Sequence, residues 1–331
     1  MNKNGLIFIL ILSVIAFFIG CPIDEEIIKS SFIEGLTLDN YPKVDGSTST
    51  APLNAIIACK LLGINYTWEG TGTIKDRIMS IKPNISKNNT KKFNRRIISS
   101  QTHNSFINLI DKKADLILSA RKMSPDEKAY ANNAGINLIE TPIALDAFIF
   151  IVNLDNPVQS LTIKQIQDIY TGKIKNWKEV GVNDADWNFL YNDAEIKPFI
   201  RNSNSGSQEL MEILVMNGLE TIELPENNFE LIFSMVGALD EVSNNQNSIC
   251  YSVYYYKEFI ASGGSTVKSI AVEGIPPTYS TISDRSYPYT AEIYAVIRSD
   301  LSESSMAFKA YEWIQTESGR AAIAESKYIL N

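Results

Sequence analysis

Histidine and cysteine are almost absent from this sequence. Among its 331 residues there are one histidine, His103, and three cysteines, at positions 21, 59 and 250. Zinc sites are built from clusters of these two residue types at short spacings, so the sequence argues against a metal site. Cys59 and Cys250 each lie in an apolar stretch, which predicts two buried free thiols rather than a disulfide. We expect neither a metal nor a cofactor.

Long hydrophobic runs are also missing, with one exception at the start of the chain. Residues 6–19 are apolar except for Ser13, follow Lys3 and are succeeded by Gly20-Cys21. The run is short for a membrane span and suits a secretory signal peptide, which we expect over residues 1–20. The closing Gly-Cys resembles a bacterial lipobox, which implies lipidation of Cys21 and an extracytoplasmic protein anchored to a bacterial membrane, at the cell surface or in the periplasm. The alternatives are a signal anchor or a plain secreted chain.

Positive charge is in deficit. The chain has 30 Lys and Arg against 38 Asp and Glu, a formal net charge of −8, which becomes −9 when Lys3 is removed with the signal peptide. An acidic protein is a poor candidate for binding nucleic acid or an anionic membrane surface. A small anion is still allowed, because a buried site is governed by its own donors. The 311 residues after residue 20 are enough for two domains.

The most informative stretch that is present is residues 201–208, Arg-Asn-Ser-Asn-Ser-Gly-Ser-Gln, which precedes apolar residues at helical spacing. Ser205 or Ser207 can cap that helix, and Gly206 lets the backbone come close to a ligand. A helix start carries unpaired N–H groups and a partial positive charge, and Arg201 adds a permanently charged fork suited to an oxyanion. The alternative is an ordinary capped helix start without a ligand.

Strands and helices alternate along the chain, which predicts an α/β fold with mostly parallel sheets. Polar turns at residues 45–50 and 101–104 lead into helices, as residues 201–208 do. In such sheets ligands collect where strand ends meet helix starts, so these turns mark a candidate site. Further predicted elements are helices over residues 51–62, 125–134, 163–170 and 304–317, strands over 95–100, 115–121, 142–153, 196–200 and 248–253, and a surface loop over 84–92.

Several stretches resemble the phosphate-binding proteins of bacterial ABC transporters. The turn Asp45-Gly46-Ser47-Thr48-Ser49-Thr50 followed by Ala51-Pro52-Leu53 is similar to the first ligand loop of that family. Residues 155–177, which include Ile169-Tyr170-Thr171-Gly172-Lys173-Ile174-Lys175-Asn176-Trp177, and the Arg201 loop are similar as well. The resemblance runs from about Tyr41 to the C-terminus.

The resemblance implies a two-lobed periplasmic-binding-protein fold of the second type, with two mixed sheets flanked by helices and a hinge between the lobes. Residues 41–146 and 286–331 would form lobe I, residues 147–285 lobe II, and residues 21–40 a tether. The long apolar strand 142–153 would cross between the lobes.

The resemblance also implies a monomeric binding protein, not an enzyme, that captures inorganic phosphate and hands it to a membrane permease. Carried over position by position, the ligand contacts would be Ser47, Thr48, Ser49, Thr102, Ser119, Arg121, Arg201, Ser205, Gly206 and Ser207. For Arg121, a salt bridge between the lobes is the alternative role.

One departure leaves the choice of anion open. Ala120 stands where many family members carry an aspartate that accepts a hydrogen bond from protonated phosphate, so another oxyanion such as sulfate is an alternative ligand. A sensor or adhesin on the same fold is a further alternative. A secreted serine hydrolase or phosphatase would need a relay through His103, and the chain has no G-x-S-x-G motif.

Overall fold

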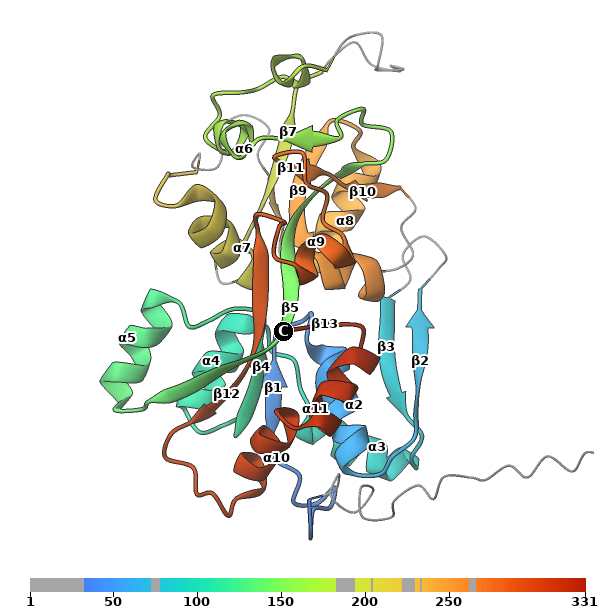
Figure 1. Ribbon diagram of the computed structural model, residues 1–331, viewed down its shortest axis with the longest axis vertical. Coiled ribbons are helices and arrows are strands. Elements are labelled where there is room, and N and C mark those ends of the chain that lie inside the picture. Colours follow the sequence, from blue (N-terminus) through green and yellow to red (C-terminus); the bar gives the residue numbers. More distant parts are fainter. Residues whose placement is uncertain are drawn as a thin grey trace, which may run out of the picture.

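The computed structural model describes residues 33–72, 78–182, 194–203, 205–221, 230–232, 234–261 and 266–331. The predicted signal peptide, Cys21 and the first part of the predicted tether lie outside these residues. Figure 1 shows two lobes, one above the other, with the long strand β5 (Leu138–Asn153) running from one into the other. Among the described residues, no helix is long and apolar enough to cross a membrane.

Strand β5 is shared by the sheets of both lobes. Its first part pairs with β12 (Thr290–Arg298) up to Ala147, and its last part pairs with β9 (Ser248–Val253) from Phe148 onward. The predicted pair of mixed sheets is therefore joined into one hydrogen-bonded order, β1-β4-β12-β5-β9-β7-β8, with β10 and β13 also on β5. The two-lobed mixed α/β fold is confirmed. The prediction of mostly parallel sheets is wrong, because β12 pairs antiparallel with both β4 and β5, and β5 pairs antiparallel with β9. The division at residues 146/147 and 285/286 stays a prediction, which this change of strand partner supports.

The lower lobe in Figure 1 contains the N-terminal elements and the end of the chain. Helices α2, α10 and α11 cover one side of its sheet, and β2 and β3 form a separate hairpin. Its elements are β1 (Val44–Gly46), α2 (Ala51–Leu61), β2 (Tyr66–Thr71), β3 (Ile78–Pro83), α3 (Lys87–Arg96), α4 (Thr102–Ile110), β4 (Leu116–Ser119), α5 (Pro125–Ala134), β12, α10 (Met306–Ile314), α11 (Glu317–Glu325) and β13 (Ile329–Leu330).

The upper lobe contains the middle of the chain (Figure 1). Strands β7 and β9 run parallel, so both end on the side that faces the lower lobe. Its elements are β6 (Ser160–Leu161), α6 (Ile163–Tyr170), η1 (Trp177–Val180), β7 (Lys197–Arg201), α7 (Gly206–Leu210), η2 (Met211–Met216), β8 (Glu230–Ile232), α8 (Met235–Asn244), β9, η3 (Tyr256–Ile260), β10 (Val267–Ser269), β11 (Ala271–Val272) and α9 (Tyr279–Ser283).

Two helices begin and end as predicted because their caps are encoded locally. In α5 and α6, Ser124 and Thr162 accept a hydrogen bond from the backbone of Glu127 and Gln165, whose side chains return the bond. Cys59 and Cys250 are buried free thiols, as predicted.

Three local predictions were wrong. Residues 84–92 were predicted to be a loop, but α3 begins there behind the Ser86 cap and buries only Phe93, so its apolar pattern is weak. Residues 95 and 96 end this helix instead of starting a strand. The closing helix is two helices, α10 and α11, since Thr316 caps a new helix before Gly319.

Candidate functional site

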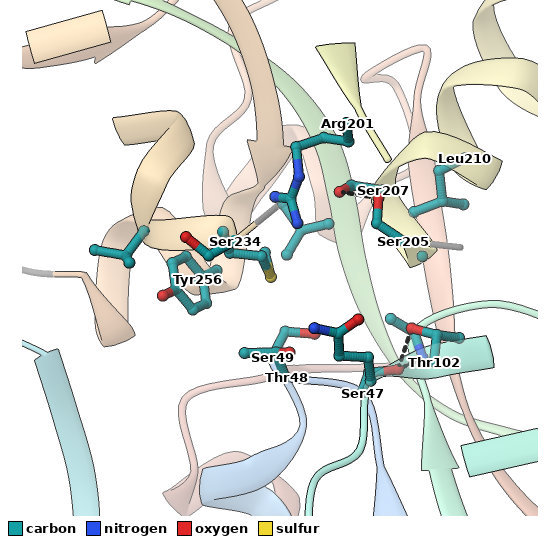
Figure 2. Close-up of a pocket in the computed structure, with 16 residues that line it drawn as sticks. Ser47, Thr48, Ser49, Thr102, Arg201, Ser205, Ser207, Leu210, Ser234 and Tyr256 are labelled. Atoms are coloured by element: carbon teal, nitrogen blue, oxygen red, sulfur yellow. Dashed lines mark hydrogen bonds between the residues drawn. The ribbon is translucent and has the colours of Figure 1, made fainter. Parts of the chain in front are cut away.

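A cavity of about 250 Å³ lies between the lobes, at the ends of β1 and β7 and the starts of four helices. Figure 2 shows Arg201 reaching from the upper lobe toward the turn at Ser47–Ser49, with Ser205 and Ser207 to one side and Ser234 and Tyr256 to the other. The residues that line the cavity are Ser47, Thr48, Ser49, Gln101, Thr102, Ala120, Arg201, Ser205, Gly206, Ser207, Leu210, Ser234, Met235, Val236, Val253 and Tyr256.

The turn between β1 and α2 forms the floor of the cavity. The Ser47 N–H donates to the carbonyl of Leu118 at 3.0 Å, and the Ser47 hydroxyl lies 2.8 Å from that of Thr102. The Ala120 N–H donates to the Ser47 hydroxyl at 2.9 Å. These bonds tie three separate segments together, so the hydroxyls of this lobe are held in place before any ligand arrives.

Helix α4 begins at the cavity, directly after a residue with an unusual backbone conformation. Gln101, which precedes it, has φ of 75°, a left-handed conformation that costs free energy for a residue other than glycine. The conformation turns the chain sharply, so that Thr102 becomes the first helical residue and lies buried at the cavity.

The positive charge at the cavity comes from the upper lobe. Arg201 ends β7 and is only 4% exposed. Its backbone N–H donates to the hydroxyl of Tyr251 at 2.9 Å and to the side-chain oxygen of Gln208 at 3.2 Å. Burial lowers the pKa of its guanidinium, yet arginine remains charged in proteins. Ser205 caps α7 by accepting from the Gln208 N–H at 3.0 Å.

Arg201 is the one charged side chain among the described residues that line the cavity, and no aspartate or glutamate is among them. A buried positive group surrounded by hydroxyls and helix starts stabilises an anion and disfavours a cation. The geometry therefore suits a small oxyanion that enters from the gap between the lobes.

The structure does not bring the side chains of Ser119 and Arg121 to this cavity. The Ser119 hydroxyl donates to the carbonyl of Arg121 at 2.6 Å. The Arg121 guanidinium forms two 2.8 Å bonds with the Glu127 carboxylate, and both side chains are buried. Arg121 therefore neutralises a buried carboxylate of its own lobe, and the predicted alternative of a salt bridge between lobes is wrong. Only Ala120 of this loop lines the cavity.

His103 also points to Glu127 and not to the cavity serines. Its Nδ1 lies 3.0 Å from Oε1 of Glu127, and His103 is not among the residues that line the cavity. A serine nucleophile needs a base within hydrogen-bond reach. In the described part of the chain, the hydrolase hypothesis has no such base.

Several lining residues were missed in the sequence. Ser234 caps α8 by accepting from the Gly237 N–H at 3.0 Å, so a fourth helix start faces the cavity. A serine placed directly before an amphipathic run was a signal for this cap. Gln101 belongs to the polar turn 101–104 that was predicted to mark the site, although it was not named as a contact, whereas Tyr256 and the apolar side chains reach the cavity through tertiary packing and carried no such signal.

Comparison with known proteins decides the family. A model described as the PBP superfamily domain matches residues 75–314, which is well over half of the chain. The chain belongs to the PBP superfamily. Curated relatives of this PBP superfamily member include the phosphate-binding protein PstS of Staphylococcus saprophyticus, 25% identical over 293 residues and covering 84% of this chain and 86% of that protein. The PstS of Borreliella burgdorferi is 25% identical over 256 residues, which cover 76% and 84% of the two chains.

Solved structures show the same fold at lower sequence identity. A substrate-binding protein of Clostridium perfringens with bound phosphate has a TM-score of 0.63 and 24% identity, over 88% of this chain and 100% of that one. An ABC-type phosphate transport receptor of Vibrio cholerae has a TM-score of 0.59 and 21% identity, over 87% and 99% of the two chains. The PstS relatives support the resemblance to phosphate-binding proteins that the ligand loops indicated, and the solved structures support the fold.

Proposed function

We propose that this protein is an extracytoplasmic solute-binding protein that captures inorganic phosphate between its lobes and delivers it to an ABC permease. The observation that carries the proposal is the cavity itself, in which buried Arg201 faces the hydroxyl-rich turn of the other lobe (Figure 2). The relatives from Staphylococcus saprophyticus and Borreliella burgdorferi are phosphate-binding proteins, which supports the same ligand.

Capture rests on hydrogen-bond donors that come from both lobes. The starts of α2 and α4 face the anion from below, and those of α7 and α8 from above. Each helix start supplies unpaired N–H groups, and Arg201 supplies charge-assisted bonds. The proposed ligand contacts are Ser47, Thr48, Ser49, Thr102, Arg201, Ser205, Gly206 and Ser207.

The hydroxyl groups give the site its tolerance for the protonation state of phosphate. A hydroxyl both donates and accepts, so the serines and threonines of the cavity can accept a hydrogen bond from a protonated phosphate oxygen. Ser119 supports the site indirectly, because its hydroxyl donates to the carbonyl of Arg121 within the loop that presents Ala120.

We also propose where the protein is located and that it acts as a monomer. A lipid on Cys21 would hold the protein, as a monomer, at the outer surface of a bacterial membrane, with residues 21–40 as the tether. Ligand capture and release by movement of the lobes about β5 then constitute the activity, with no bond made or broken in the ligand.

The experiment is calorimetric titration of phosphate into protein refolded to remove bound anion, comparing wild type with Arg201→Ala. Truncating one partner of a buried charge pair costs about 2–5 kcal/mol, so the affinity should fall by that amount. Arg285→Ala is the matched control, since Arg285 is exposed and pairs with Glu292 at 3.0 Å away from the cavity. Unchanged phosphate affinity in Arg201→Ala would contradict the proposal, and native mass spectrometry before refolding identifies the anion that copurifies.

A further inference from the structure

A second, larger cavity lies beside the anion cavity. Its volume is about 460 Å³, and it shares three wall residues with the first: Thr48, Gln101 and Tyr256. The rest of its wall comes from Ala51, Pro52, Ala55, Ile78, Met79, Ser80, Ile81, Phe93, Asn94, Ile97, Ile98, Ser99 and Ile260. We refer to this space as the apolar chamber.

The chamber has the chemistry of a site for a neutral, hydrophobic group. Its described wall contains no aspartate, glutamate, lysine or arginine, and most of its side chains are aliphatic or aromatic. Helix α2 contributes Pro52 and Ala55, hairpin strand β3 contributes Ile78 and Ile81, and α3 contributes Phe93. Six wall residues carry a hydroxyl or amide group, namely Thr48, Ser80, Asn94, Ser99, Gln101 and Tyr256, but the remaining ten are apolar and favour burial of carbon.

The chamber is present although the lobes already touch at two places, one at the anion cavity and one at the chamber wall. At the anion cavity, Gly206 approaches Thr102 so closely that a Cβ atom on the glycine would lie 2.3 Å from the threonine hydroxyl. At the chamber wall, β3 of the lower lobe packs against η3 of the upper lobe. The chamber is therefore present in a structure whose lobes are in contact, and both β3 and η3 contribute to its wall.

Gln101 stands at the junction of the two cavities. Its φ of 75° is a conformation that an unconstrained glutamine rarely adopts. The side chain lines both the anion cavity and the chamber. The surrounding fold holds this strained residue between a charged site and an apolar site. We therefore expect Gln101 to contact the ligand and to affect which ligands bind.

From these observations we propose that the site also accepts phosphate monoesters and alkylphosphonates that carry a short, neutral, apolar substituent. The phosphoryl group occupies the anion cavity with Arg201, and the substituent passes Gln101 and Tyr256 into the apolar chamber. The inference rests on the proposed function, because it uses the same oxyanion site, and it adds a class of ligand to it.

The test is a calorimetric series of inorganic phosphate, methyl phosphate, propyl phosphate, butyl phosphate and phenyl phosphate against the refolded wild-type protein. Each methylene buried in the chamber should tighten binding roughly fourfold, from about 0.8 kcal/mol per buried methylene. Butyl phosphate should therefore bind more than tenfold tighter than methyl phosphate.

Two variants locate the effect. Ala55→Phe fills the chamber from α2 and should remove the dependence on chain length while leaving inorganic phosphate affinity within about threefold of wild type, a difference below 1 kcal/mol. Ile98→Ser removes a side chain that is 45% exposed, so folding should tolerate it, and should weaken butyl phosphate more than phosphate. Leu154→Ser is the matched control, since Leu154 is 51% exposed and does not line the chamber.

The outcomes separate the two proposals. Tight phosphate binding with no gain from methyl to butyl phosphate, or a gain that persists unchanged in both chamber variants, overturns this inference and leaves the proposed function standing. Failure of every member of the series to bind, inorganic phosphate included, overturns both.

Discussion

Gly206 and Thr102 are in contact across the two lobes, at a separation that leaves no room for a side chain. A Cβ atom built on Gly206 would lie 2.3 Å from Oγ1 and 3.0 Å from Cβ of Thr102. Gly206 is the first residue of α7 and Thr102 the first of α4. Both residues also line the anion cavity, so the contact lies where the two lobes meet at the site.

Gly206→Ala should weaken anion binding without unfolding the protein. The added methyl group collides with Thr102 only when the lobes are together, and overpacking of this kind costs about 1–3 kcal/mol. Phosphate affinity should therefore fall by roughly 5- to 150-fold. Thermal unfolding without ligand should change little, because alanine is a better helix former than glycine.

A double-mutant cycle provides the control for this contact. In a Thr102→Ala background, the additional loss from Gly206→Ala should be much smaller, because the atom at 2.3 Å is gone. Strictly additive losses would show that the glycine acts through α7 alone and not through closure.

Among the described residues three arginines are buried, and two of them, Arg121 and Arg201, should separate effects on stability from effects on binding. Glu127→Ala leaves Arg121 charged and without its bidentate partner, which should cost about 3–5 kcal/mol of unfolding free energy. Phosphate affinity of the folded fraction should stay close to wild type, since neither residue lines the cavity. Denaturant unfolding and calorimetry on the same preparations measure the two effects.

Arg201→Ala provides the opposite pattern in the same assays. Its loss should appear mainly in binding, because Arg201 faces the cavity (Figure 2). If Glu127→Ala reduced phosphate affinity as strongly as Arg201→Ala in fully folded protein, Arg121 would have to act on the anion directly.

Arg201 and Arg121 also show which side-chain roles could be predicted from the sequence and which could not. The Arg201 loop combines a cap, a glycine and a charged fork within eight residues, so its role was predictable from local chemistry. Arg121 looked equivalent in its loop, but its partner Glu127 is also the capping glutamate of α5. A capping box was visible in the sequence, while the second use of its carboxylate depends on tertiary packing.

The same distinction explains the rest of the fold. Helices with their own caps, such as α5 and α6, were predicted to the residue. The weakly apolar α3 was missed, because its one buried side chain, Phe93, gives no periodic pattern. Tyr256 and Gln101 reach the cavity from segments far apart in the chain, and only the folded structure brings them together.

Asp146 should make stability depend on pH. The side chain is buried where β5 leaves one lobe, and its Oδ1 accepts from the N–H groups of Ala147 and Tyr255. Burial raises the pKa of Asp146 to about 7, against about 3.9 in an unfolded chain. Tyr254, Tyr255 and Tyr328 face it and bring no positive charge.

The direction of this pH dependence follows from whether the folded or the unfolded state holds the proton on Asp146. Below pH about 4 the carboxyl is protonated in both states, so burial carries no ionisation penalty. Between pH 4 and 7 the unfolded chain releases the proton and the folded chain keeps it, so stability falls as pH rises. Asp146→Asn removes this contribution and should be the more stable protein at pH 8, by at most about 4 kcal/mol. Thermal unfolding at pH 4.5 and pH 8 measures it, and parallel pH profiles for the two proteins would contradict the assignment.

Ala120→Asp should sharpen the choice between phosphate and sulfate. Ala120 is 6% exposed and lines the cavity, where no described lining residue carries a carboxylate. A carboxylate here can accept a hydrogen bond from protonated phosphate but faces fully ionised sulfate with repulsion only. A hydrogen bond to a charged group contributes about 1.5–3 kcal/mol, so the ratio of phosphate to sulfate affinity should rise at least about tenfold.

Wild type should bind both anions measurably in competition calorimetry, because its hydroxyl groups can donate hydrogen bonds to either anion. Ala120→Asn is the control of matched size without the charge, and its affinity ratio should stay near that of wild type. An aspartate variant that weakens both anions equally would show that the added carboxylate repels any anion, and that discrimination is made elsewhere in the cavity.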